Sequence, residues 1–167
     1  NEKNEMINHP GQWLFEEGFA YWDGSDFKKK DETRGQLMIK ASASAGFPMA
    51  VAFCHYMGWN GLKMDSKKAF DEFVKIEKDT NGYHWTQFMI GVCYKYGYGT
   101  EKDLTKAVEW YTKSVEQGNN NAMITLGFCY ENGFGVTKDM TKAFELYEQS
   151  ALLGNSPGMY NVGVCYE

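Results

Sequence analysis

The residues with the clearest chemical potential are three cysteines that recur at a fixed interval. Cys93, Cys129 and Cys165 lie 36 residues apart, each within a tetrapeptide GVCY or GFCY. Thiols in such a series could bind a metal ion, relay electrons or form disulfides. They could equally be small apolar residues that fill the same position in copies of one structural unit. The elements that carry the cysteines decide between these alternatives.

A repeat of 36 residues runs through most of the chain. Gly46, Gly82, Gly118 and Gly154 keep this interval, and the segments KDLTKA and KDMTKA are also 36 residues apart. A fixed period of this length is typical of stacked helical units. In the second half of the unit, small and large core-type residues lie on one helical stripe: Ala143, Leu146, Tyr147, Ser150 and Ala151.

Each unit is predicted to be a pair of helices joined by a glycine-rich loop. Four aspartates stand four residues before the second helical stripe, where a carboxylate can cap a helix: Asp31, Asp65, Asp103 and Asp139. A calcium array is the alternative for these aspartates, but whole units separate them. Gly127 lies inside the first helix, which predicts a close approach of the second helix at that point.

The stacking of units argues against chemistry at the cysteines. Equivalent atoms of neighbouring units should lie about 10 Å apart, whereas a disulfide needs Cα atoms within about 7 Å. The second helices, at 103–116 and 139–152, contain no cysteine to serve as a partner. We therefore interpret Cys93, Cys129 and Cys165 as buried packing residues.

The overall composition narrows the classes of function. The chain has 167 residues, 43% of them hydrophobic, and a net charge of −5, which argues against nucleic-acid binding. It contains no apolar stretch long enough to cross a membrane. It begins without a methionine or a signal-peptide pattern and ends inside a predicted helix, so we expect it to be part of a longer or processed chain.

The repeat resembles the Sel-1-like repeat, a relative of the tetratricopeptide repeat. The residues that carry the likeness are Ala122, Leu126, Gly127, Tyr130, Gly133, Gly135, Val136, Asp139, Lys142, Ala143, Tyr147, Ser150, Ala151, Gly154 and Asn155. The resemblance implies an all-α, right-handed solenoid of antiparallel helix pairs that forms a single domain over 1–167. The expected repeats span 9–46, 47–82, 83–118 and 119–154, with a partial repeat at 155–167.

The second repeat fits the pattern less well than the others. Its first helix is predicted to begin about two residues late, and its second helix to run about two residues longer. On this alignment Cys54 is not equivalent to Cys93, and His55 takes the place of the cysteine.

The resemblance also implies an inner face for partner binding, formed by the first helix of each repeat. The implied positions are Gln12, Phe15, Phe19 and Trp22, then Phe47, Ala50, Cys54 and Met57, then Trp85, Phe88, Val92 and Lys95, and finally Asn121, Ile124, Phe128 and Glu131. Their aromatic rings either fill the inside of a tight superhelix or line an open groove for a helix or an extended segment. On the groove interpretation, Trp85→Ala and Phe88→Ala should weaken binding without unfolding the protein.

We therefore expect a non-enzymatic scaffold or adaptor that binds a protein or peptide segment, in the cytoplasm. His9, His55 and His84 are scattered, Glu109 and Glu131 are assigned to solvent, and no catalytic, cofactor or metal motif is present in the sequence. Two alternatives come from the resemblance: a quality-control adaptor of the secretory pathway, and a bacterial hydrolase of cell-wall or β-lactam substrates.

The C-terminal segment suggests a second surface. Val162, Cys165 and Tyr166 form the apolar stripe of a first helix whose second helix is not in the sequence. Because the ends of solenoids normally need a polar cap, this stripe should contact further sequence or drive self-association.

Overall fold

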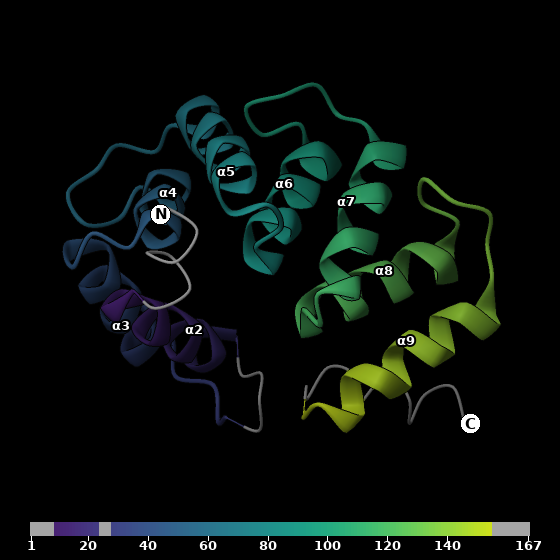
Figure 1. Ribbon diagram of the computed structural model, residues 1–167. Helices are drawn as coiled ribbons and strands as arrows, with labels where there is room; N and C mark the ends of the chain where they lie inside the picture. The colour runs from purple at the N-terminus through teal and green to yellow at the C-terminus, as the bar shows by residue number, and fades with distance from the viewer. Residues whose placement is uncertain (1–8, 24–27, 155–167) are drawn as a thin grey trace.

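The computed structural model describes residues 9–23 and 28–154, and these form eight α-helices and no strand (Figure 1). Consecutive helices pack as antiparallel pairs, and the pairs follow one another along a curved stack. We refer to the two helices of a pair as helix A and helix B. The A helices are α2 (Pro10–Asp23), α4 (Pro48–Met57), α6 (His84–Tyr96) and α8 (Asn120–Asn132), and the B helices are α3 (Glu32–Ser44), α5 (Ser66–Thr80), α7 (Leu104–Glu116) and α9 (Met140–Leu152). The predicted all-helical solenoid is confirmed.

Each helix B begins at an aspartate that caps it. The side chains of Asp31, Asp65, Asp103 and Asp139 each accept a hydrogen bond from the backbone N–H three residues later, at 2.9–3.0 Å. Such a cap stabilises a helix by about 1 kcal/mol. The backbone N–H of Asp103 also donates to the Tyr94 carbonyl oxygen at 2.9 Å, which fixes the start of helix B against the end of helix A. The predicted capping role is therefore confirmed.

The hairpins of the third and fourth repeats close around a glycine in helix A. A Cβ atom added at Gly91 would lie 2.6 Å from the Tyr111 ring, and one added at Gly127 would lie 2.6 Å from the Tyr147 ring. These distances are far below van der Waals contact, so only glycine permits the observed spacing of the two helices. The close approach predicted at Gly127 is confirmed.

The second repeat differs from the alignment predicted for it. Gly58 ends α4 in a left-handed conformation, and its N–H donates to the Cys54 carbonyl oxygen, as Gly97 does to Cys93 at the end of α6. Cys54 is therefore equivalent to Cys93. The prediction that His55 takes the place of the cysteine is wrong.

Three changes of length hide this register in the sequence. α4 has 10 residues where α6 has 13, and α5 has 15 where α7 has 13. One further residue is added in the loop between α4 and α5. Because the losses and gains cancel, the second repeat keeps the 36-residue spacing of its flanking glycines. Pro48 begins α4 late, as predicted, but the shortening is confined to the start of this helix.

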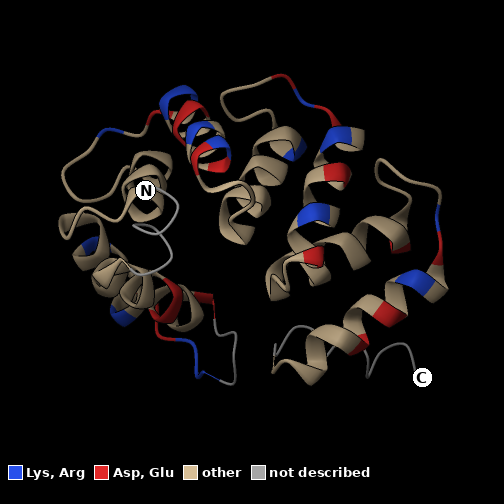
Figure 2. Cartoon of the chain, viewed as in Figure 1, with Lys and Arg blue, Asp and Glu red and all other residues tan. Residues whose placement is uncertain are grey.

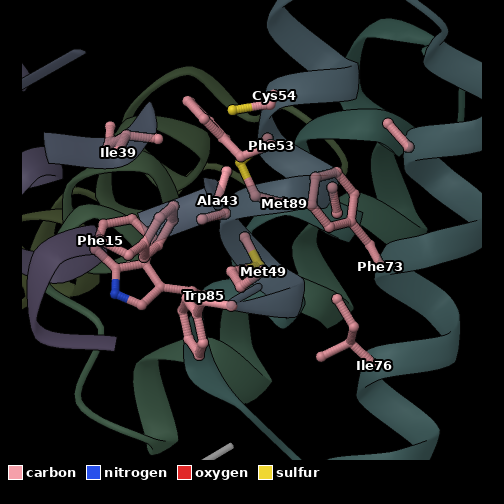
Figure 3. Packing of buried hydrophobic residues seen from close by; sticks show 14 of the residues in the cluster. Phe15, Ile39, Ala43, Met49, Phe53, Cys54, Phe73, Ile76, Trp85 and Met89 are labelled. Atoms are coloured by element: carbon pink, nitrogen blue, oxygen red, sulfur yellow. The ribbon is translucent and has the colours of Figure 1, made fainter. Parts of the chain in front are cut away.

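The apolar interior is continuous across the first three repeats (Figure 3). Phe15, Phe53 and Trp85 meet in this cluster although they belong to three different A helices. A second cluster around Tyr111 and Leu126 joins the third and fourth repeats. The core is therefore made between repeats as well as within them, as expected for a solenoid.

The three described cysteines are unpaired and buried in these clusters. Cys54 and Cys93 are completely buried and Cys129 nearly so. Burial raises the pKa of the Cys93 thiol to about 12 and also raises the pKa of Cys129. Such thiols are poor nucleophiles and pack as small apolar groups. The packing interpretation is confirmed for Cys93 and Cys129, whereas Cys165 lies outside the described residues.

The described helices are short. The longest is α5, with 15 residues, and none of the described helices is long and apolar enough to cross a membrane. The predicted C-terminal stripe of Val162, Cys165 and Tyr166 lies outside the described residues, so self-association through it remains a prediction.

Candidate functional site

The A helices of the last three repeats carry almost no charge. α4 contains no Lys, Arg, Asp or Glu, α6 contains only Lys95 and α8 contains only Glu131. The B helices α5 and α7 instead carry alternating basic and acidic residues (Figure 2). The two sides of the stack therefore differ in chemistry, and the A side is suited to apolar contact.

A groove crosses the A side and is lined by all four A helices. It has a volume of about 300 Å³, which is the lower end of the range for ligand sites. Five of its residues are aromatic and one is charged. The lining consists of Phe19, Trp22, Asp23, Phe53, Tyr56, Phe88, Met89, Val92, Asn121, Ile124 and Thr125.

Two polar contacts join distant repeats beside this groove. The Asn121 side-chain amide of α8 donates to the Asp23 carboxylate of α2 at 2.7 Å. The Tyr83 hydroxyl donates to the Glu16 carboxylate at 3.0 Å, and burial together with the Glu16 charge raises the pKa of Tyr83. These contacts show that the stack curves tightly enough for its first and fourth repeats to face one cavity.

Six of the predicted inner-face residues line the groove, namely Phe19, Trp22, Phe88, Val92, Asn121 and Ile124. Phe19 is 5% exposed and forms part of the floor, whereas the other five are half-buried. The interpretation of the inner face as an open groove therefore holds for part of it.

Three other predicted contact residues are packing residues. Phe15 and Phe47 are fully buried, and Trp85 is 8% exposed, with its ring centroid 4.3 Å from that of Phe19 and 5.7 Å from that of Phe15. α4 lacks the first turn that α2 and α6 possess, so the rings of Phe15 and Trp85 meet directly. The structure thus places Trp85 among the rings that fill the inside of the superhelix, and we now expect Trp85→Ala to impair folding.

The remaining predicted contact residues lie outside the groove lining. Lys95 places its ammonium group 5.6 Å from the centre of the Phe128 ring, and Met57 borders a separate small hollow. Glu131 accepts a hydrogen bond from the buried Tyr147 hydroxyl at 2.6 Å. Glu131 was predicted both to face solvent and to bind a partner, but its bond to Tyr147 gives it a structural role.

Phe53 and Tyr56 line the groove but were not predicted, and the second repeat contributes them in place of Cys54 and Met57. The signal was present, because Gly58 follows Cys54 by four residues, just as a glycine follows each of the other cysteines in the described chain. Counting from this glycine gives the correct register.

Three further groove residues were also missed, namely Asp23, Met89 and Thr125. Each directly follows a predicted contact residue in the sequence. Adjacent positions on a helix point about 100° apart, so the groove is wide enough to include the neighbouring row of side chains.

A smaller, polar hollow adjoins the groove at Asn121. It has a volume of about 160 Å³, and its lining includes Glu16, His84 and Asn119. The Asn119 amide nitrogen lies 3.0 Å from His84 Nδ1, and burial lowers the pKa of His84 to about 4. The imidazole is therefore neutral at pH 7.

Acidification should destabilise the protein through His84. Its pKa is about 4 when folded and about 6.5 when unfolded, so the unfolded state takes up the proton first as the pH falls. We expect the free energy of unfolding to fall by about 2–3 kcal/mol between pH 7 and pH 4.5 because of His84. The His84→Gln variant should not show this decrease. Urea unfolding of both proteins at several pH values measures the difference. Equal pH dependence of the two proteins would contradict this assignment.

The three histidines occupy separate places. His9 packs against the Phe47 ring, His55 Nδ1 lies 2.9 Å from the Glu72 carboxylate, and His84 borders the polar hollow. Within the part of the chain that the structure describes, no three His, Cys, Asp or Glu residues are grouped to hold a metal ion.

The fold and the groove together define a solenoid of helical hairpins with a shared apolar inner surface. The sequence pattern of the Sel1 repeat matches residues 49–71, 86–119, 120–155 and 156–167. These segments make up more than half of the chain, which therefore belongs to the Sel1 repeat family. The first hairpin, α2 with α3, lies outside these segments and has the same architecture.

Two curated relatives share part of this sequence. The DAP3-binding cell death enhancer 1 of Rattus norvegicus is 31% identical over 92 residues, which cover 55% of this chain and 18% of the rat protein. The protein of the same name from Mus musculus is 30% identical over 92 residues and is covered to the same extent. The chain therefore spans less than a fifth of these relatives.

Solved structures share the fold over nearly the whole chain. A protective antigen from uropathogenic Escherichia coli matches with a TM-score of 0.64 and 26% identity, over 99% of this chain and 35% of the antigen. A Sel1 repeat protein from Oxalobacter formigenes matches with a TM-score of 0.66 and 24% identity, over 99% of this chain and 70% of that protein. Cysteine-rich protein B of Helicobacter pylori matches with a TM-score of 0.53 and 20% identity, over 91% of this chain and 96% of that protein.

Proposed function

We propose that this chain is a non-catalytic protein-interaction module that binds a peptide or protein segment in the groove across its A helices. Sel1 repeats generally mediate protein interactions, which supports the class of function. The observation that carries the proposal is the groove itself, an apolar cavity of about 300 Å³ to which all four repeats contribute. The cytoplasmic location remains a prediction.

The dimensions and chemistry of the groove favour a segment over a flat protein surface. Its floor consists of Phe19, Phe53 and Met89, which are rigidly packed in the core. Its walls are half-buried side chains such as Trp22, and burying a bulky apolar anchor against such walls is the usual source of binding energy at hot spots. The cavity has room for one or two large side chains, so neighbouring residues of the segment would run along the A helices.

The relatives support a binding role without naming a partner for this chain. The rat and mouse proteins are described as DAP3-binding, and the region shared with this chain is a minor part of each.

The test uses a phage-displayed library of random 12-residue peptides selected on the folded domain. We expect selected peptides to lose at least tenfold in affinity when Val92 is replaced by arginine, because the long charged side chain fills the groove. Thr105→Arg is the matched control, since it adds the same charge at an exposed position of α7. Circular dichroism checks that both variants fold. Peptides that bind Val92→Arg as well as the original protein would contradict the proposal.

A further inference from the structure

We propose that the groove holds a basic side chain, Lys or Arg, of the segment that binds there. This inference rests on the proposed function and specifies the partner. Aromatic rings line the cavity beside a carboxylate, and this pairing is the general chemistry of sites that recognise ammonium and guanidinium groups.

The aromatic rings of the floor and the walls contact one another. The Phe53 ring lies at the centre, with centroids 5.9 Å from Trp22, 5.5 Å from Phe19 and 5.9 Å from Tyr56. Phe88 completes the lining from α6. A cation within about 6 Å of such ring faces is attracted by their quadrupoles, and tryptophan gives the strongest attraction. Partial burial strengthens this attraction because less water competes for the cation.

The charged side chain that lines the groove is acidic. Asp23 is the one charged residue among the described residues that line it. Glu16 stands two helical turns earlier on α2 and belongs to the adjoining polar hollow, where the amide of Gln12 and the hydroxyl of Tyr83 donate to it. Both donors are neutral, so they leave the charge of the Glu16 carboxylate in place. A segment with a positive charge is therefore attracted, and an acidic segment is repelled.

Elsewhere in the described part of the chain, cationic side chains lie against half-buried aromatic rings. Arg34 lies 4.1 Å from the centre of the Tyr21 ring, and Lys113 lies 4.0 Å from that of Trp110. Of the cation–ring contacts within the described ranges, none involves a ring that lines the groove. Trp22, Tyr56 and Phe88 are half-buried, so their rings are available to a cation from another molecule, whereas Phe19 and Phe53 are buried in the floor.

The experiment starts from the peptides selected on the folded domain. We expect Lys or Arg to be enriched next to a bulky apolar residue. In the best synthetic peptide, replacing Lys by norleucine or Arg by citrulline should weaken binding by at least about fivefold, because the charge is lost while the shape is kept. Isothermal titration calorimetry at two salt concentrations measures the affinities.

The protein variants locate the cation. Asp23→Asn should weaken binding of the basic peptide about fivefold and leave the affinity for the norleucine or citrulline peptide unchanged. Glu17→Gln is the matched control, because it removes one negative charge from the same helix at a residue that pairs with Lys28 and does not line the groove. If Asp23→Asn fails to fold, Trp22→Leu tests the ring contribution and should produce a similar loss.

The outcomes separate the two proposals. Peptides that Val92→Arg displaces but that show no basic preference, or an acidic one, would overturn the cation proposal and leave the proposed function intact. Peptides that bind regardless of Val92→Arg would overturn both. Equal effects of Asp23→Asn and Glu17→Gln would show attraction by the net charge of the protein alone and would also overturn the cation site.

Discussion

Replacing Gly91 by alanine is expected to lower the free energy of unfolding by about 2 kcal/mol, although alanine is the better helix former. In an ordinary helix interior this change would stabilise the protein by up to about 1 kcal/mol. Here the new methyl group would lie 2.6 Å from Cδ1 and Cε1 of Tyr111 and 3.2 Å from the Ala107 carbonyl oxygen. Tyr111 is fully buried, so its ring cannot move aside without opening the core.

Urea unfolding followed by circular dichroism measures the effect of Gly91→Ala. Ala41→Gly, at an exposed position of α3, is the control for helix propensity and should cost about 1 kcal/mol. The double variant Gly91→Ala with Tyr111→Leu should be less destabilised than the sum of its single variants, because the smaller side chain leaves room for the methyl group. A stabilising effect of Gly91→Ala would show that the helices are not held at this distance.

The repeat could be predicted from the sequence because its signals are local. Asp103 and Asp139 mark the start of helix B, and Gly91 and Gly127 mark the contact between the two helices, all at a constant spacing. Each of these roles depends on atoms within one hairpin. A local cause leaves a recognisable pattern, which is why the capped helix pair was predicted correctly from the residues, whereas the solenoid was implied by the family resemblance.

The second repeat was misaligned because its length is preserved while its parts are not. Three residues are lost from the start of α4, one is gained in the following loop and two are gained in α5. When the sequence is compared with itself at an interval of 36 residues, the ends of the second repeat align correctly. The residues between these ends are then assigned to the wrong positions. Phe53 and Tyr56, which line the groove, were therefore replaced in the prediction by the residues that directly follow them, Cys54 and Met57.

The distinction between packing residues and groove residues could not be predicted because it depends on curvature. Trp85 and Phe88 are three residues apart on α6 and both were assigned to the inner face. The contact of Trp85 with Phe15 exists because α4 begins late, and Asn121 reaches Asp23 because the stack is tightly curved. These contacts join residues that are 70 and 98 positions apart in different repeats. The sequence of a single repeat contains no pattern that predicts them.

The assignment of Trp85 to the core leads to the largest expected effect of a single substitution. Trp85→Ala should lower the free energy of unfolding by about 3–5 kcal/mol, which is typical of removing a buried aromatic side chain. The indole ring contacts Phe15, Phe19 and Phe88 on three sides. Its loss would leave a cavity between the first and third repeats, where α4 is too short to fill the space.

Trp22→Leu is the matched comparison, since Trp22 is also an A-helix tryptophan but is half-buried at the groove wall. We expect Trp22→Leu to cost about 1 kcal/mol, because leucine keeps part of the apolar contact with Phe19 and Phe53, and to weaken peptide binding. Urea unfolding and peptide titration on the same preparations distinguish the two tryptophans. If Trp85→Ala were as stable as Trp22→Leu and bound peptide less well, Trp85 would belong to the binding surface and the boundary between core and groove would have to be moved.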